Sequence, residues 1–148
     1  MTGMSKWCAD DFDNRGQLKV KISFWIALVI QFRAELLLFG AGLGDDYHWF
    51  SVLYPDEFSF YYGILSGVPA IMMLFLYPVR VRFGGIASVL YWFLFIVSAT
   101  SVVKNGVEYY IYGTDNYAIF LEMISLVLLW PDRRLREVFT RKNTGIFA

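Results

Sequence analysis

Residues 22–43 read ISFWIALVIQFRAELLLFGAGL, an almost wholly apolar run with an arginine and a glutamate near its middle. About 20 helical residues, each rising roughly 1.5 Å, cross the roughly 30 Å hydrocarbon core of a bilayer. The run is therefore long enough to form a transmembrane helix. A guanidinium at that depth is costly and needs a partner inside the protein. Arg33 thus raises two questions: how the helices pack, and whether their interior carries chemistry.

The composition of the whole chain is typical of a membrane protein. Of its 148 residues, 57% are hydrophobic and 20% are aromatic, and the mean hydropathy is +0.48. Soluble domains of this size rarely reach such values. The formal net charge is zero, which gives no indication of a nucleic-acid partner.

Three further apolar runs follow, and together the runs predict an all-α membrane protein with a single domain, residues 1–148. The first span is expected to act as an uncleaved signal-anchor, because no signal peptide precedes it. The fourth run is short, so it either starts earlier, near Ile111, or thins the bilayer locally. The predicted parts are a polar N-terminal segment, 1–21, four spans, 22–43, 58–77, 83–103 and 117–130, and a tail, 131–148.

Basic residues alternate between the segments that join the spans. The N-terminal segment carries four lysines and arginines, the second loop carries Arg80 and Arg82, and the tail carries five. The first loop carries none and the third carries only Lys104. By the positive-inside rule, this pattern predicts that both termini lie in the cytoplasm.

Four polar residues within the spans are candidates for interior chemistry: Gln31, Arg33 and Glu35 in the first span and Glu122 in the fourth. Arg33 and Glu35 are two residues apart, so they point to different sides of one helix. At about 1.5 Å per residue, Arg33 and Glu122 lie at nearly the same height above the inner ends of their spans. We therefore predict an intramembrane ion pair between Arg33 and Glu122, with Gln31 as a neighbouring polar contact. We interpret the pair as structural, and the alternative is a proton or cation relay that uses Glu35 or Glu122.

Small residues mark the second span. Gly63 and Gly67 are four residues apart, a spacing that lets helix backbones approach closely. The close approach is either internal to the chain or between two copies in a homodimer. Pro69 follows and is expected to bend the helix.

Two regions are candidates for contact with a partner. After Pro131, apolar residues recur at helical spacing between cations, which predicts a short basic amphipathic helix. This helix either lies on the anionic inner leaflet, is a simple charged tail, or binds a protein. The two outer loops are rich in acidic and aromatic groups. The predicted contact residues are Arg133, Arg134, Arg136, Phe139, Asp45, Asp46, Trp49, Tyr109 and Tyr110.

The sequence contains no recognisable catalytic or cofactor motif. There is no Ser-His-Asp set, phosphate-binding loop, zinc motif or pair of catalytic acids. The single histidine, His48, lies beside Asp45 and Asp46, but a metal site normally needs three or four preorganised ligands. We therefore expect no enzyme activity, no metal and no cofactor.

Three motifs carry a family resemblance. They are the D-x-F-D-x-x-G-x-L-K pattern of residues 10–19, the Tyr-Pro-Asp step of residues 54–56, and the Arg-Arg-Leu-Arg step of residues 133–136. They resemble an uncharacterised bacterial inner-membrane family, a domain of unknown function. The resemblance implies four spans and a location in the bacterial inner membrane, but no reaction. The chain departs from the family pattern at Val20-Lys21 and at Arg33-Ala34-Glu35.

Size and architecture are also similar to entry-exclusion proteins of conjugative elements, which block redundant transfer by recognising a donor's conjugation protein. From these patterns we predict a non-enzymatic recognition protein of the inner membrane that acts by protein–protein contact. Its expected partners are membrane lipid and either another membrane protein or a second copy of itself. The alternative is a small proton-coupled transporter that uses an intramembrane carboxylate.

Overall fold

The computed structural model describes residues 8–43, 54, 56–113 and 117–139. Within these ranges the structure is all-α, as predicted, and the β-structure is confined to one isolated bridge. In chain order the elements are η1 (Ala9–Asp11), α1 (Ile22–Gln31), α2 (Arg33–Leu43), α4 (Glu57–Leu76), η2 (Tyr77–Val79), α5 (Gly84–Tyr112), α6 (Ala118–Leu128) and α7 (Arg133–Phe139).

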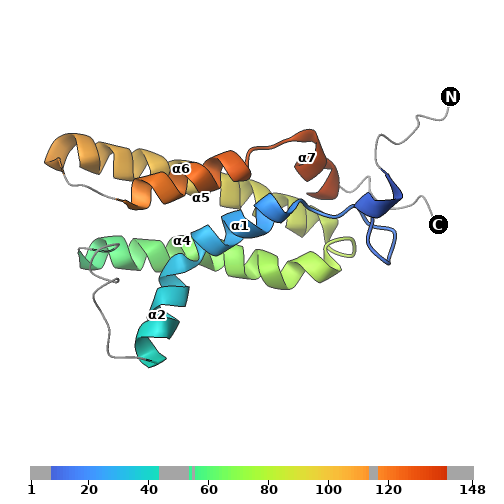
Figure 1. The fold of residues 1–148 in the computed structure, drawn as a ribbon, viewed down its shortest axis with the longest axis horizontal. Coiled ribbons are helices and arrows are strands. Elements are labelled where there is room, and N and C mark those ends of the chain that lie inside the picture. Colours follow the sequence, from blue (N-terminus) through green and yellow to red (C-terminus); the bar gives the residue numbers. More distant parts are fainter. Residues whose placement is uncertain (1–7, 44–53, 55, 114–116, 140–148) are drawn as a thin grey trace.

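Helices α1, α4, α5 and α6 alternate in direction and pack as a bundle (Figure 1). Around the bundle axis, α1 contacts α6, α6 contacts α5, α5 contacts α4, and α4 contacts α1. η1 and α7 lie at one end of the bundle, which we name the terminal end. The opposite end, where α4 and α6 begin and α5 ends, is named the distal end.

The helices differ greatly in length. Two segments are long and apolar enough to cross a membrane: Glu57–Val79, with 23 residues, and α5, with 29 residues. The bent pair of α1 and α2 gives a third candidate if it counts as one span. α6 has 11 residues and rises about 16 Å, which is roughly half of the thickness of a hydrocarbon core. Helix length in the described residues therefore supports two or three spans, and the fourth stays a prediction.

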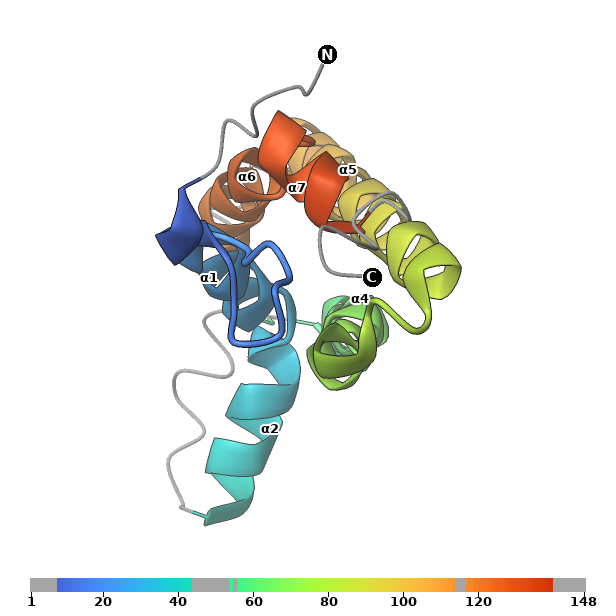
Figure 2. The same cartoon turned by 90° about the vertical axis from the view of Figure 1, so that its right-hand side faces the viewer.

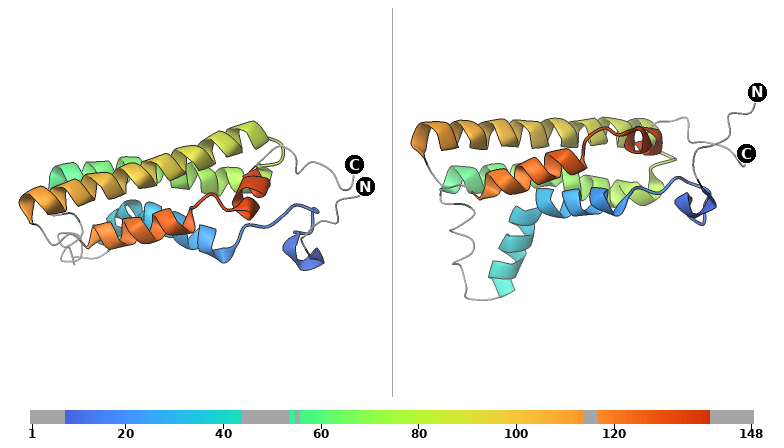
Figure 3. Two further views of the ribbon diagram at one scale, coloured as in Figure 1. Left: turned by 90° about the horizontal axis from the view of Figure 1, so that it is seen from above. Right: turned by 45° about the horizontal axis from the view of Figure 1, so that its top comes forward.

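α5 continues through residues 104–112, which belong to the predicted third loop. The fourth predicted span therefore does not start near Ile111, because that residue belongs to α5. Figure 3 shows the result: α5 runs the length of the bundle, whereas α1 and α6 cover only part of it. α5 ends at Tyr112, and the φ of 60° at the following Gly113 gives the left-handed conformation that often ends a helix.

The first predicted span is not one continuous straight helix. Phe32 has φ −95° and ψ 23°, and α2 leaves α1 at an angle of 61°. The break leaves the carbonyl of Ile30 as an acceptor for Arg33 Nη1, at 2.8 Å. α2 therefore projects from the bundle as an arm that packs on α4 near its base (Figure 2).

Within the N-terminal segment that was predicted to be simply polar, residues 8–21 are folded onto the bundle. Phe12 and Leu18 form an antiparallel bridge, and Gly16, with φ 70°, turns the chain between them. Asp13 Oδ1 accepts the backbone N–H of Gln17 at 2.9 Å and holds this turn. The turn brings Leu18 back onto the bundle, where it is 1% exposed and belongs to the hydrophobic core.

α7 also packs back onto the terminal end. The predicted apolar face is buried, and Phe139, its largest member, is 2% exposed. The Phe139 ring stacks on Tyr91 with centroids 5.1 Å apart, and lies 5.3 Å from the ring of Phe24. The nearest apolar surface for this short helix is the open end of its own bundle. Phe139 is therefore a core residue, which corrects its prediction as a partner contact, and the apolar face of α7 does not lie on the leaflet.

Gly63 and Gly67 pack inside the chain. A Cβ added at Gly63 would lie 2.7 Å from the Tyr54 ring, and one added at Gly67 would overlap the Glu35 carboxylate of the arm. Both glycines are buried. The close approach is internal, so this face is not available for the predicted homodimer. α4 continues through the buried Pro69 as one helix.

Candidate functional site

A network of polar side chains lies inside the bundle. Arg33 Nη2 donates to Glu122 Oε1 at 2.7 Å. Gln31 Nε2 donates to Ser125 Oγ at 2.8 Å and to Glu122 Oε2 at 3.5 Å. Gln31 and Glu122 are each 1% exposed, and Ser125 is fully buried. The structure thus brings together Gln31, Arg33 and Glu122, the residues for which the sequence predicted mutual contact. We call these three residues and Ser125 the polar network.

The positions of the network follow from the helix geometry. Gln31 ends α1 and Arg33 begins α2, so the bend at Phe32 presents both side chains to α6. Glu122 and Ser125 are three residues apart and therefore share one face of α6. α1 and α6 are packed side by side along this face.

The electrostatics of the network favour a structural role. The Glu122 carboxylate accepts one charge-assisted bond and one longer amide bond, while the guanidinium also donates to the carbonyl of Ile30. An isolated charge at the bilayer centre costs at least about 2.5–3.5 kcal/mol on insertion scales, so pairing offsets a substantial penalty. The guanidinium at 2.7 Å is a fixed, charge-assisted partner of this carboxylate.

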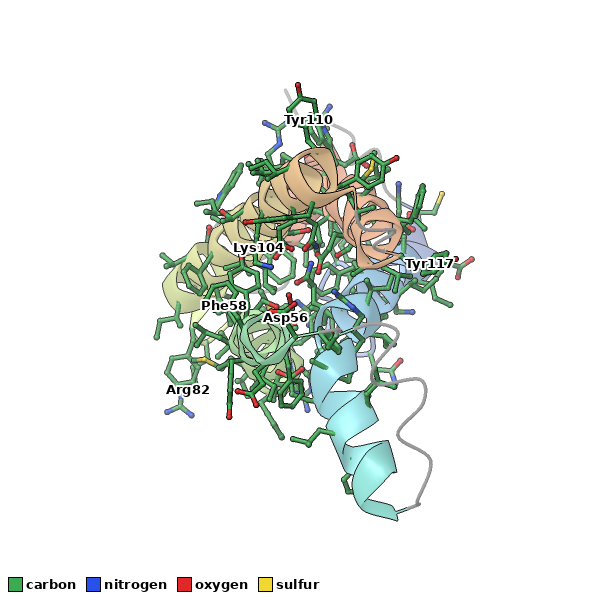
Figure 4. The ribbon with its side chains drawn as sticks, turned by 90° about the vertical axis from the view of Figure 1, so that its left-hand side faces the viewer. Asp56, Phe58, Arg82, Lys104, Tyr110 and Tyr117 are labelled. Carbon is green, nitrogen blue, oxygen red and sulfur yellow. The ribbon has the colours of Figure 1, made fainter. Side chains whose placement is uncertain are left out.

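A small polar cavity of about 20 Å³ adjoins the ion pair on its distal side. Such a volume is close to that of a single water and far below that of a pocket for an organic solute. At its rim, Lys104 pairs with Glu108 at 2.8 Å and lies 5.1 Å from the Tyr62 ring. Figure 4 looks onto this end and shows Lys104 and Phe58 close together, with Nζ 5.5 Å from the ring. The cavity is lined by Arg33, Tyr54, Ser59, Tyr62, Gly63, Ser66, Lys104, Asn105, Ala118 and Glu122.

Glu35 lies outside the polar network. Its carboxylate faces Gly67 of α4, and both of its oxygens are buried without a hydrogen-bond partner in the part of the chain that the structure describes. Among the same residues no ion pair joins Glu35 to Arg33, in agreement with their spacing. Glu35 is therefore a second interior acid, in a different environment from Glu122.

The predicted contact arginines of α7 differ in their surroundings. Arg133 and Arg136 are exposed, and Arg133 pairs with Glu137 at 2.9 Å. Arg134 is partly buried and pairs with Asp11 at 2.8 Å. Asp132 directly precedes α7: its carboxylate accepts the Arg133 backbone N–H at 2.7 Å, and this bond, followed by the Lys21 ammonium, lowers the pKa of Asp132.

The predicted contact residues of the outer loops are only partly described. Tyr109 and Tyr110 lie on the last turn of α5, where they are 54% and 89% exposed. Asp45, Asp46 and Trp49 lie outside the described residues.

A set of ion pairs that the sequence did not predict fastens the terminal end. Asp11 pairs with Arg134 at 2.8 Å, and Asp13 lies 3.8 Å from Arg80. Arg80 is 4% exposed and also donates to the carbonyl of Leu18 at 3.0 Å. The available signal was the complementary charge of two family motifs, one acidic at the start of the chain and one basic near its end.

Two comparisons with known proteins bear on this arrangement. A family model described as "Protein of unknown function (DUF2919)" matches residues 7–141. The inner membrane protein YfeZ of Escherichia coli (strain K12) is 26% identical over 136 residues, which cover 86% of this chain and 90% of that protein. No solved structure gives a significant match. The predicted resemblance to an uncharacterised bacterial inner-membrane family is therefore confirmed.

Proposed function

Because the chain belongs to the DUF2919 family of proteins of unknown function, we propose its role from the structure: it acts by contact with another inner-membrane protein, without catalysis. In this proposal the terminal end, with its many basic residues, faces the cytoplasm, so that both termini are cytoplasmic. α6 completes a fourth crossing through a locally thinned bilayer.

The α2 arm carries this proposal. It diverges from α1 by 61°, and among the described residues it packs mainly on α4 and on α1. Leu36, Leu38 and Phe39 are 47%, 50% and 71% exposed, so the arm presents an apolar surface outside the bundle. A Cβ added at Gly40 would meet nothing within 4 Å, which leaves room for the backbone of a partner helix. The occupant that fits this surface is a transmembrane helix of another protein.

The interior of the bundle supports contact over transport. Tyr91, Leu94 and Leu129 close its terminal half, each 0–1% exposed, and Tyr91 OH donates to the Leu129 carbonyl at 2.8 Å. α7 covers the same end. Among the described residues, a small cavity thus lies on the distal side, and packed apolar side chains lie between it and the terminal end.

Photocross-linking in intact membranes tests the arm directly. A benzophenone amino acid in place of Phe39 is expected to give discrete protein adducts, because this position faces a partner helix. The matched control is Phe75 on α4, which is 77% exposed and is expected to give lipid adducts only.

The adducts decide between three outcomes. The proposal requires a membrane protein, identified by mass spectrometry, whose deletion removes the adduct and whose own cross-link maps to a transmembrane helix. Adducts between two differently tagged copies of this chain would instead show self-association. Equal lipid adducts at Phe39 and Phe75 would remove the arm as a contact surface and the contact role with it.

A second candidate, proton-coupled transport, is favoured by one observation, the state of Glu35. Burying an ionised carboxylate without a hydrogen bond is costly, and in this candidate Glu35 takes up and releases the transported proton. The comparisons give no support to entry exclusion, which rests on size and architecture alone, and our proposal does not include it.

Glu35→Gln separates the two candidates. If Glu35 exchanges a proton, infrared difference spectra between acidic and basic pH should contain the carbonyl band of one carboxylic acid that disappears in this variant. Glu57→Gln, at an exposed position of α4, is the control and should retain the band. Thermal unfolding of both variants should match the unsubstituted protein. Retention of that band in Glu35→Gln would end the transport candidate.

A further inference from the structure

A recess of about 450 Å³ opens at the terminal end, between the N-terminal loop and the connection from α4 to α5. The recess is distinct from the polar network, which lies deeper in the bundle. We name it the basic recess, and it is lined by Asp13, Asn14, Arg15, Lys19, Tyr77, Pro78 and Arg80.

The charge of the basic recess is unbalanced. Its lining holds three cations and one carboxylate, a formal charge of +2. Arg80 and Asp13 face each other at 3.8 Å and offset one another. Arg15 reaches the Pro78 carbonyl at 3.3 Å, and Lys19 reaches the Asp10 carbonyl at 3.4 Å. Both bonds are long and end on neutral groups, and within the described ranges neither cation has a carboxylate within ion-pair distance.

The recess lies where a membrane helix meets the headgroup region. Tyr77 and Pro78 end the apolar segment Glu57–Val79. The Tyr77 ring packs edge-on against Trp25 at 4.7 Å, and such amphipathic rings prefer the headgroup level. The Tyr77 hydroxyl accepts the Val20 N–H at 3.3 Å, which leaves its own proton for a ligand. The helix that leads into the recess exposes Phe75 at 77%, so an apolar surface adjoins the cations.

We propose that the basic recess binds the phosphodiester headgroup of an anionic glycerophospholipid. Arg15 and Lys19 contact the phosphate, Asn14 and the Tyr77 hydroxyl donate hydrogen bonds to the headgroup oxygens, and the acyl chains run along α4. Basic pockets beside transmembrane helices are typical sites for anionic lipid headgroups. The inference rests on the placement of the terminal end at a membrane surface and does not depend on the partner proposed for the arm.

Lipid binding to the purified full-length protein in detergent tests this site. A fluorescent short-chain phosphatidylglycerol is titrated against the unsubstituted protein and two double variants. Arg15→Gln/Lys19→Gln should weaken binding by roughly 25-fold, at about 5-fold for each cation removed. Arg133→Gln/Arg136→Gln removes the same formal charge from the exposed side of α7 and should leave the affinity almost unchanged.

Three further measurements make the result decisive. Phosphatidylcholine of the same chain length should bind far more weakly than phosphatidylglycerol, and inorganic phosphate should not displace the lipid at equal concentration. Arg15→Lys should retain most of the affinity, because it keeps the charge. If the double variant unfolds, Lys19→Gln alone serves, since the bond that its ammonium makes among the described residues ends on a backbone carbonyl. Equal losses in both double variants, no preference for the anionic lipid, or equal binding of free phosphate would each overturn the proposal.

Discussion

Glu122→Ala is expected to reduce the free energy of unfolding by about 3–5 kcal/mol, because removing one partner of a buried ion pair leaves the other charge uncompensated. The side chain of Glu122 is 2% exposed and that of Arg33 is 13% exposed, so water cannot replace the lost carboxylate fully. The substitution also removes the acceptor shared with Gln31. Chemical unfolding in detergent micelles measures the effect.

A double-mutant cycle identifies the cause of this loss. Arg33→Leu in the Glu122→Ala background should recover part of the stability, since the buried cation is then gone. Glu108→Ala is the matched control: its partner Lys104 lies at the rim of the cavity, and a partly exposed pair contributes about 0–1 kcal/mol. Purely additive effects of Arg33→Leu and Glu122→Ala would show that the ion pair does not hold α2 to α6.

Depth counting along the sequence predicted the Arg33–Glu122 pair, and the two side chains lie 2.7 Å apart in the structure. The counting works because α1 starts, and α6 ends, toward the terminal end of the bundle. Residues at similar distances along these two helices therefore lie at similar heights. The same counting could not reveal the bend at Phe32. Hydropathy is summed over a window and is the same for a straight helix and for a broken one.

The terminal end was less predictable, for a different physical reason. Asp11 and Asp13 read as solvated charges until their arginine partners are placed, and these partners lie far away in the sequence. The amphipathic pattern of α7 predicted a helix, which the structure contains at Arg133–Phe139. It could not predict which apolar surface the helix would cover, because a leaflet and a bundle end satisfy the same pattern.

Gly63 and Gly67 illustrate the same limit. Their spacing predicted a close approach, and the structure places Tyr54 and the arm against them. A pattern of small residues on one helix does not specify the opposing surface. The opposing groups here lie on a different helix and in the connection before α4, so only the tertiary structure could exclude the homodimer at this face.

Phe139→Ala is the second substitution with a large expected effect, a loss of about 3–5 kcal/mol in the free energy of unfolding. The ring lies between Tyr91 and Phe24, so its removal leaves a cavity at the end of the core. α7 has only seven residues and is too short to be stable alone, so this contact should determine whether it stays folded.

Arg136→Ala distinguishes packing on the bundle from binding to the leaflet. Arg136 is exposed on the same helix, and such surface substitutions usually change stability by less than about 0.5 kcal/mol. If α7 instead lies on the leaflet, Phe139→Ala should change the free energy of unfolding in detergent only slightly. Arg136→Ala should then weaken the association of α7 with a membrane. Equal unfolding free energies for the two variants would therefore show that α7 does not close the terminal end of the bundle.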